Sequence, residues 1–312
     1  MMLKRKILLF GATGEIGGRV ARYAADEGHE VVAVSRGKRT IRTPLDGVKV
    51  LQGDKYDREF LKTLVPFEPD VLIDTTANET GARNYAEIFP FVRSVFFVSS
   101  TGVYAPIRYF PAAEDHPWQR DTGVNFPHQV KKDLCFLEMF REQGFPVTLF
   151  RPSNIFGPGS VPLDLWGGRD PEFFRALKEN RPVAVPACFE NILIQSCVNS
   201  DIAKCIVLAL RKPDEVKGEI FNISSERAIT LGLYLETVMD YFGSRSEIRR
   251  VPVEELMTLY PGKIDRADLD FFLCHMSIDI SKAVRVLGYK PEWTVQTGLI
   301  ETLRTCEEQG LF

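Results

Sequence analysis

The segment Lys6–Gly18, KILLFGATGEIGG, decides the fold of this 312-residue chain. Its apolar half ends at three glycines with the spacing G-x-x-G-x-x-G, and a helical pattern follows from Arg19 to Glu27. Glycine permits the positive φ of a tight turn, and backbone N–H groups at the start of a helix attract an anion. The order of strand, turn and helix therefore predicts a dinucleotide-binding turn rather than a glycine-rich turn without a ligand. The residues expected to hold the pyrophosphate are Gly11, Thr13, Gly14, Glu15, Ile16 and Gly17.

Strand-like apolar runs alternate with helical patterns through the first half of the chain. The strands are expected at Ile7–Phe10, Glu30–Val34, Val48–Leu51, Val71–Asp74, Val95–Ser99 and Val147–Arg151. Helices such as Arg58–Leu64 and Val130–Gln143 are expected between them. This alternation predicts an α/β fold, in which a doubly wound parallel sheet has right-handed crossovers and helices on both faces.

The composition changes after Arg151, where prolines and glycines crowd the chain as far as Gly168. This change predicts a smaller C-terminal lobe with long connections. Strands are expected there at Ile192–Val198 and Glu219–Ile223, and helices at Ser200–Leu210, Asp279–Tyr289 and Thr294–Glu308. Ser200 or Asp201 is expected near the N-cap of the first of these helices, and Gly288 is expected to end the second.

Composition and charge argue against several classes of protein. Hydrophobic residues make up 45% and charged residues 26% of the chain, as in ordinary globular enzymes. No apolar run approaches the ~18 residues of a membrane span, and the first apolar residues belong to the glycine turn, which leaves no room for a signal peptide. A formal net charge of −3 argues against a nucleic-acid binder. Six cysteines without C-x-x-C pairs and four histidines without ligand spacing predict a reduced, cytoplasmic protein with no metal site.

Several motifs of this chain occur together in one known family. They are Gly11–Gly17, Gly53-Asp54, Ser99–Tyr104, Arg151–Gly159 and Leu287–Pro291. With them the chain resembles, over essentially its whole length, the extended branch of the short-chain dehydrogenase/reductase superfamily, of the NAD-dependent epimerase/dehydratase type. The resemblance implies an NAD(P)-binding Rossmann domain over residues 1–155 and a smaller substrate-binding lobe over residues 156–312, from which some segments return to the Rossmann core. It also implies a small-molecule substrate, often a nucleotide-linked sugar, and a homodimer in many members.

The end of the second strand bears on the choice of cofactor. An NAD site usually has an acidic residue there, whereas this chain has Ser35 and Arg36, followed by Lys38 and Arg39. Cations pair with a 2′-phosphate, so we expect NADP in preference to NAD, unless these charges only form a solvated loop. The resemblance also implies that Asp54 lies on the adenine side, although it could instead cap the helix that follows. It further implies contacts from the residues that follow the fourth strand, which are Thr75, Thr76 and Ala77.

The resemblance implies catalysis by a Ser or Thr, a Tyr and a Lys. Ser100, four residues before Tyr104, aligns with the catalytic hydroxyl. Thr101-Gly102 stands where sugar dehydratases carry Asp-Glu, which argues against a 4,6-dehydratase. The Tyr-x-x-x-Lys unit is broken, because the residue four before Lys132 is His128.

Three hypotheses follow from the missing tyrosine. His128 replaces it as the proton carrier while Lys132 holds the nicotinamide ribose, because a histidine titrates near neutrality. Alternatively, Tyr104 or Tyr109 reaches the site from a loop. In the third case the protein binds its cofactor without turnover, as a regulator or an RNA-associated protein. Such a protein would resemble the atypical chloroplast stem-loop-binding group, in which the fold is kept and the tyrosine is absent.

The second half of the chain offers cations for a nucleotide diphosphate. The candidates are Arg169, Arg175, Lys178, Arg181 and Arg211, and the sequence does not choose among them. Arg151, at the end of a strand, is expected to pair with a carboxylate. Bulky aromatic residues of this half are expected to pack in the core or a lid, namely Trp166, Phe173, Phe174 and Phe189. The leading expectation is an NAD(P)-dependent oxidoreductase or epimerase that acts on a hydroxyl or carbonyl carbon.

Overall fold

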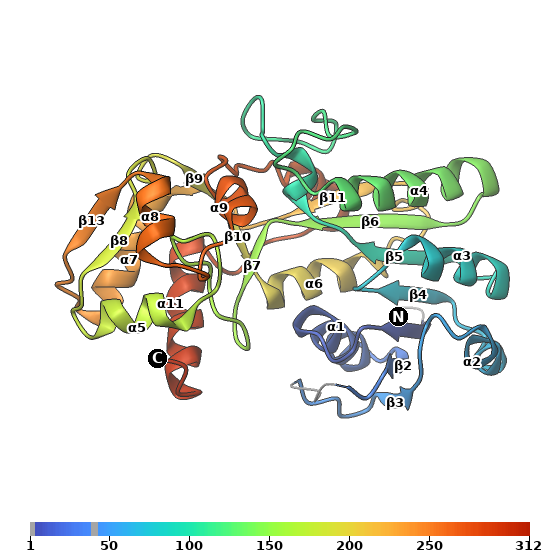
Figure 1. The fold of residues 1–312 in the computed structure, drawn as a ribbon. Coiled ribbons are helices and arrows are strands. Elements are labelled where there is room, and N and C mark those ends of the chain that lie inside the picture. The colour runs from blue at the N-terminus through green and yellow to red at the C-terminus, as the bar shows by residue number, and fades with distance from the viewer. Residues whose placement is uncertain (1–3, 39–42) are drawn as a thin grey trace.

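Seven parallel strands form the central sheet of the computed structural model, which describes residues 4–38 and 43–312 (Figure 1). The order across the sheet is β11-β6-β5-β4-β1-β2-β3. The strands are β1 (Lys6–Phe10), β2 (Glu30–Ser35), β3 (Lys49–Gln52), β4 (Val71–Asp74), β5 (Ser94–Val98), β6 (Val147–Pro152) and β11 (Ile220–Ile223). The six strands predicted in the first half are confirmed to within a residue at each end. The expected strand at Glu219–Ile223 pairs with β6 as the edge strand of this sheet.

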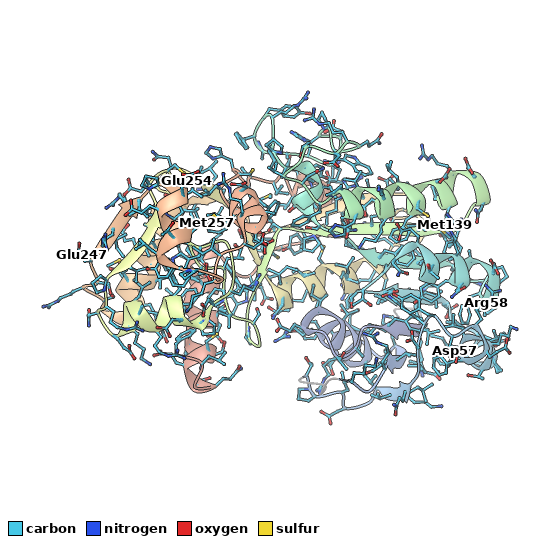
Figure 2. All side chains as sticks on the ribbon, in the orientation of Figure 1. Asp57, Arg58, Met139, Glu247, Glu254 and Met257 are labelled. Carbon is cyan, nitrogen blue, oxygen red and sulfur yellow. The ribbon has the colours of Figure 1, made fainter. Side chains whose placement is uncertain are left out.

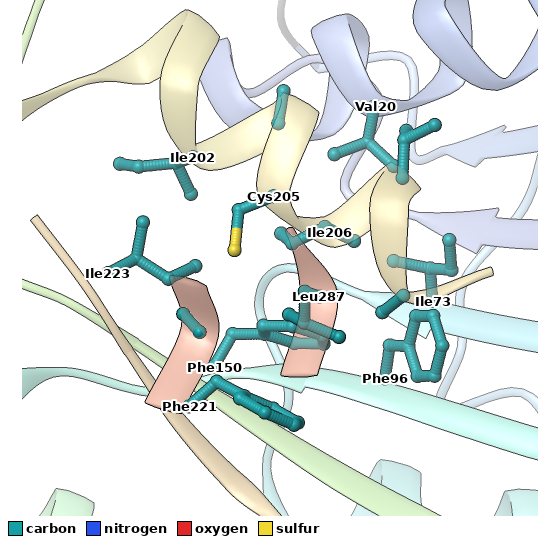
Figure 3. Packing of buried hydrophobic residues seen from close by; sticks show 14 of the residues in the cluster. Val20, Ile73, Phe96, Phe150, Ile202, Cys205, Ile206, Phe221, Ile223 and Leu287 are labelled. Atoms are coloured by element: carbon teal, nitrogen blue, oxygen red, sulfur yellow. The ribbon is translucent and has the colours of Figure 1, made fainter. Parts of the chain in front are cut away.

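Helices cover both faces of the sheet, as the alternating pattern predicts (Figure 1). One face carries α1 (Glu15–Asp26), α6 (Asn199–Ala209) and α10 (Ser281–Leu287), and the other carries α2 (Arg58–Thr63), α3 (Glu79–Ile88) and α4 (Pro127–Gln143). Successive residues of a strand point to opposite faces, so Leu9 and Ile73 lie in the first core and Leu8 and Leu72 in the second. Figure 3 shows the first core, where Cys205 and Ile206 of α6 lie over the phenylalanines of the sheet.

The second half of the chain builds a separate hydrophobic core, in the left part of Figure 1. Its strands are β7 (Asn154–Phe156), β8 (Val183–Pro186), β9 (Leu193–Ile194), β10 (Ser196–Val198), β12 (Ile229–Thr230) and β13 (Ile248–Val251). Its helices are α5 (Pro171–Lys178), α7 (Leu231–Phe242), α8 (Val253–Leu259), α9 (Arg266–Phe272) and α11 (Val295–Glu308). Trp166, Phe173, Phe174 and Phe189 are buried in this core, which confirms their predicted packing role. No helix of the described residues has both the length and the apolar character needed to cross a bilayer.

One local prediction for this half is wrong. The expected strand Ile192–Val198 divides into β9 and β10, which belong to different sheets, because the Gln195 amide between them bonds to the backbone of Ser225 and Ile278. Val198 occupies the N-cap of α6, and Ser200 and Asp201 lie near it in the first turn of the helix. The Asp201 carboxylate accepts the backbone N–H of Glu292 at 3.0 Å and ties the C-terminal segment to this helix.

A buried ion pair fastens α4 to the sheet. The Asp133 and Arg151 side chains are both 0% exposed, and Arg151 donates from Nε to Asp133 Oδ2 at 2.9 Å. The same carboxylate accepts hydrogen bonds from Ser99 at 2.7 Å and from Gln129 at 3.0 Å. The predicted pairing of Arg151 with a carboxylate is therefore confirmed. Because a buried charge is costly without its partner, this arrangement fixes the position of α4 on β5 and β6.

We predict that Arg151→Met lowers the free energy of unfolding by about 3–5 kcal/mol, since Asp133 then remains buried without a counter-charge. The double variant Asp133→Asn with Arg151→Met removes both charges and should lose less stability than Arg151→Met alone. Urea denaturation followed by circular dichroism measures both values. Equal losses in the single and the double variant would show that the ion pair is not the source of the effect.

Candidate functional site

The predicted dinucleotide turn lies between β1 and α1. Gly11 has φ +94°, and its carbonyl accepts the Gly14 N–H at 2.9 Å. A Cβ at Gly17 would lie 2.3 Å from the Gly11 carbonyl oxygen, so only glycine lets α1 approach the turn this closely. The N-cap of α1 is Gly14, and no side chain caps it. The first turn of this helix therefore offers the cradle of backbone N–H groups that a pyrophosphate needs.

The other expected cofactor residues lie at the carboxyl edge of the same sheet. Ser35 ends β2, where its hydroxyl accepts the Gly37 N–H at 3.1 Å, and the neighbouring Arg36 is exposed. Thr75, Thr76 and Ala77 follow β4, the strand beside β1. Arg39, the other cation considered at this edge, lies outside the described residues.

Asp54 does not cap the helix that follows it, so this alternative is wrong. The cap of α2 is Asp57, labelled in Figure 2, whose carboxylate accepts the N–H groups of Glu59 and Phe60. Asp54 instead accepts the Tyr56 N–H at 3.0 Å in the preceding turn. The Asp54 side chain is half-buried there, two residues after the end of β3.

A buried lysine supports the cofactor edge and was not predicted from the sequence. Lys55 donates to Asp74 at 2.8 Å and to the backbone carbonyl of Thr76 at 2.5 Å. Tyr85 of α3 donates to the same carboxylate at 3.0 Å. This cluster fixes the direction in which the chain leaves β4. Lys55 sits 19 residues before Asp74, and no local pattern in the sequence signals the pairing.

A pocket of about 510 Å³ opens at the carboxyl ends of β5 and β6. One wall belongs to the Rossmann part and includes Ser99, Ser100 and Gly102, and another belongs to α9 and includes Asp268 and Phe271. Its volume lies in the range of small-molecule sites, and it lies where α/β sheets bind their substrates. The segment Asp265–Asp270 thus contributes the Asp268 side chain to this pocket.

Ser100 and Lys132 come from two elements that the Asp133–Arg151 pair holds together. Ser100 is half-buried in the pocket wall, and its hydroxyl accepts the Gly102 N–H at 3.1 Å. Lys132 is half-buried on α4 and forms no hydrogen bond or ion pair with any described residue. Partial burial lowers the pKa of its ammonium group. Since Asp133 and Glu79 oppose this shift electrostatically, Lys132 lies near α3 and the carboxyl end of β4.

His128 lies on the same helix but is exposed and does not line the pocket. Its ring contacts that of Phe126, with 6.0 Å between centroids, and Phe126 in turn stacks on Phe271. A Cβ at Gly102 would lie 2.5 Å from the Phe126 ring. This ring therefore packs over Gly102.

The hypothesis that a loop tyrosine serves as the proton donor is corrected by the structure. Tyr104 is 1% exposed, accepts a hydrogen bond from Arg151 at 2.9 Å and donates to Asn222 at 2.9 Å. Burial raises the pKa of its phenol. Tyr109 is exposed and packs against His116. Neither tyrosine lines the pocket. Tyr104 is buried in the core, and Tyr109 lies exposed on a loop.

The cations of the second half of the chain separate into two groups. Four are held by carboxylates away from the pocket, namely Arg175, Lys178, Arg181 and Arg211. Arg169 lines the pocket, where its guanidinium donates to the backbone carbonyls of Ile155 and Val161 and has no carboxylate partner among the described residues.

Asp164 shapes the loop that carries Arg169. This buried carboxylate accepts the N–H groups of Trp166 at 2.7 Å and Asp170 at 2.7 Å. A third backbone donor, Gly168, lies 3.2 Å away. These hydrogen bonds close the turn that presents the Arg169 guanidinium to the pocket. No sequence motif predicted them. Across the described ranges 4–38 and 43–312, no group of three or more His, Cys, Asp or Glu is placed to hold a metal ion.

Comparisons with known proteins agree with this architecture. The sequence model of the "NAD dependent epimerase/dehydratase family" matches residues 7–224. The chain is 28% identical to the chloroplast stem-loop binding protein of 41 kDa b from Arabidopsis thaliana, over 99% of this chain and 81% of that protein. It is 23% identical to a UDP-N-acetyl-alpha-D-glucosaminuronate decarboxylase from Bacillus cytotoxicus, over 98% of this chain and 99% of that enzyme. Its fold is that of the UDP-glucose 4-epimerase from Thermotoga maritima, solved with UDP-glucose, at a TM-score of 0.75, 18% identity and coverage of 97% and 99%.

We predict that Gly17→Ala lowers the melting temperature by several degrees, because its Cβ would overlap the Gly11 carbonyl at 2.3 Å and force α1 away from β1. Gly14→Ala is the matched control, since a Cβ there meets its nearest atom at 3.2 Å and Gly14 has an ordinary φ of −81°. Thermal unfolding of both variants measures the difference. Equal melting temperatures would show that the close packing at Gly17 is not required.

Proposed function

Because this chain belongs to the NAD dependent epimerase/dehydratase family, we propose that it is an oxidoreductase or epimerase of a nucleotide-linked sugar. The observation that carries the proposal is the uncapped, glycine-lined N-terminus of α1 beside a pocket that contains Ser100. A bound nicotinamide would supply the hydride acceptor or donor for a hydroxyl-bearing or carbonyl carbon. Binding without turnover is the competing hypothesis, because none of the described residues that line this pocket is a tyrosine.

We further propose NADP as the preferred dinucleotide. Arg36 and Lys38 are exposed beside the end of β2, and neither side chain is paired with a described carboxylate. Ser35 stands where a carboxylate would repel a 2′-phosphate. A phosphate dianion between such cations gains charge-assisted hydrogen bonds that a ribose hydroxyl does not.

Three side chains have proposed roles in the reaction. The Ser100 hydroxyl donates a hydrogen bond to the reacting oxygen of the sugar and favours the negative charge that develops on it. Lys132, which has no hydrogen-bond or ion-pair partner among the described residues, holds the ribose hydroxyls of the dinucleotide. His128, one turn before Lys132 on α4, is the proposed proton carrier.

Arg169 is the proposed contact for the nucleotide diphosphate. It is the arginine in the described pocket wall, and its two backbone partners leave further N–H groups for an anion. Bidentate guanidinium contacts suit phosphate oxygens. The substrate would then lie with its diphosphate toward α5 and its sugar toward Ser100.

The cofactor assignment is tested by titrating NADP and NAD into the protein. We expect NADP to bind more tightly, and Arg36→Ala to weaken NADP by about tenfold while leaving NAD nearly unchanged, because one charge-assisted hydrogen bond is worth about 1.5–3 kcal/mol. Isothermal titration calorimetry measures both affinities. Equal affinities in the wild-type protein would refute the preference, and no heat with either dinucleotide would refute the cofactor site itself.

Turnover is tested by screening UDP- and dTDP-sugars for oxidation, reduction or epimerisation with added dinucleotide. Ser100→Ala and Lys132→Met should each lower kcat by at least about a hundredfold, because each removes a group that acts on the transition state or holds the cofactor. His128→Gln should lower kcat, because it removes the proposed proton carrier. Arg169→Met should raise KM with kcat largely kept, whereas Arg211→Met, which removes a cation paired with Glu27 outside the pocket, should change neither.

Two outcomes contradict the proposal. If no nucleotide sugar is converted while the dinucleotide still binds, the protein is a cofactor-loaded binder. If His128→Gln leaves kcat unchanged while Asp268→Asn lowers it, the proton carrier is the carboxylate in the pocket wall.

A further inference from the structure

A second, larger cavity of about 1190 Å³ lies outside the site described above. It is bounded by the loop after β11, by α10 with the turn that follows it, and by Phe110. None of its lining residues is shared with the pocket at Ser100. Neither the glycine turn nor Lys132 reaches it. The proposed enzyme activity leaves this cavity without a role.

Three exposed cations line the cavity. Arg227 comes from the loop after β11, and Arg285 and Lys290 come from the end of α10 and the turn beyond it. None of their side chains forms a hydrogen bond or an ion pair with a described residue. Elsewhere most arginines and lysines are paired, as Lys204 is with Glu292 and Lys282 with Glu219. Arg36 and Lys38, which are proposed to contact the 2′-phosphate of the cofactor, likewise have no partner among the described residues.

The two carboxylates of the cavity limit the kind of anion it can hold. Glu226 and Asp279 line it, and one oxygen of Asp279 already accepts the Ser281 N–H at 2.7 Å. A singly charged ligand would gain little where acids partly offset the cations. A ligand with several negative charges within a few ångströms can engage all three cations at once.

The same cavity presents apolar surface to solvent. Phe110 is 47% exposed and Val284 is 46% exposed, and both line the cavity. The Phe110 ring meets His275 edge to face, at 5.5 Å between centroids, and keeps about half of its surface free. An exposed ring beside cations offers the stacking partner that a nucleobase uses.

We propose that this cavity is a second binding site, for a free nucleoside diphosphate or triphosphate. The phosphates lie among Arg227, Arg285 and Lys290, and the base lies against Phe110 and Val284. Such a site is separate from both the dinucleotide turn and the substrate pocket. It would give the protein a way to sense nucleotide phosphates while the first site is occupied.

The test titrates ADP into the full-length protein by isothermal titration calorimetry, with NADP or NAD present at saturation. The double variant Arg227→Ala with Arg285→Ala should weaken ADP binding by at least about tenfold, since two charge-assisted contacts are lost. The matched control is Arg245→Ala with Arg249→Ala, which removes two exposed, unpaired cations outside the cavity and should leave the affinity unchanged. Phe110→Ala should weaken ADP but not inorganic pyrophosphate, because only ADP has a base to stack.

Equal ADP affinity in the two double variants would overturn the proposal, as would binding that Arg169→Met abolishes, which would place ADP in the substrate pocket. Tight binding of a single-stranded oligonucleotide with no measurable ADP binding would also overturn it, in favour of a nucleic-acid surface. These results are independent of the proposed enzyme activity. If the proposed activity is wrong, the wild-type protein and both double variants will alike give no heat on titration with the dinucleotide, or no turnover.

Discussion

The buried contact between Asp133 and Arg151 is the constraint on which the rest of the site depends. It joins α4 to β6, and Ser99 of the pocket wall donates to the same carboxylate. Two buried charges are stable only when they are well aligned with each other and when the remaining hydrogen-bonding groups of both side chains have partners. The helix that carries Lys132 therefore has little freedom to slide along the sheet edge that carries Ser100. An electrostatic requirement of the core thus sets the geometry of the candidate active site.

The carboxyl edge of the parallel sheet collects the rest of the site. There the chain leaves β1 through the glycine turn and leaves β4 through a segment fixed by Lys55 and Asp74. Parallel strands bring all such exits to one edge, which is why α/β proteins bind ligands there. The second half of the chain adds the opposite wall, with Arg169 presented by the turn that Asp164 closes. Cofactor and substrate thus depend on separate polar clusters within one edge.

The Tyr-x-x-x-Lys unit expected in this family has His128 in place of its tyrosine, so the site needs another proton carrier. Tyr104 is a structural residue that accepts a hydrogen bond from Arg151, donates one to Asn222 and does not line the pocket. Phe126 packs over Gly102 and narrows the pocket beside Ser100. The chain therefore combines the fold of its family with a pocket that contains Ser100 and that neither Tyr104 nor Tyr109 lines. This combination accounts for a chain that resembles both sugar-nucleotide enzymes and a stem-loop binding protein.

The sequence by itself determined the features that depend on neighbours along the chain. The apolar runs of the first six strands, the glycine turn and the final helix α11 all follow local rules of burial, backbone freedom and periodicity. The division of β9 from β10 and the exposure of His128 did not follow, because their causes lie in residues that are distant in sequence. Only the tertiary structure decided that Lys55 pairs with Asp74 and that Arg169 alone of the candidate cations meets the pocket. The partner of a side chain depends on which distant segment of the chain packs against it. The hydrophobic periodicity of a sequence indicates local structure and does not contain this information.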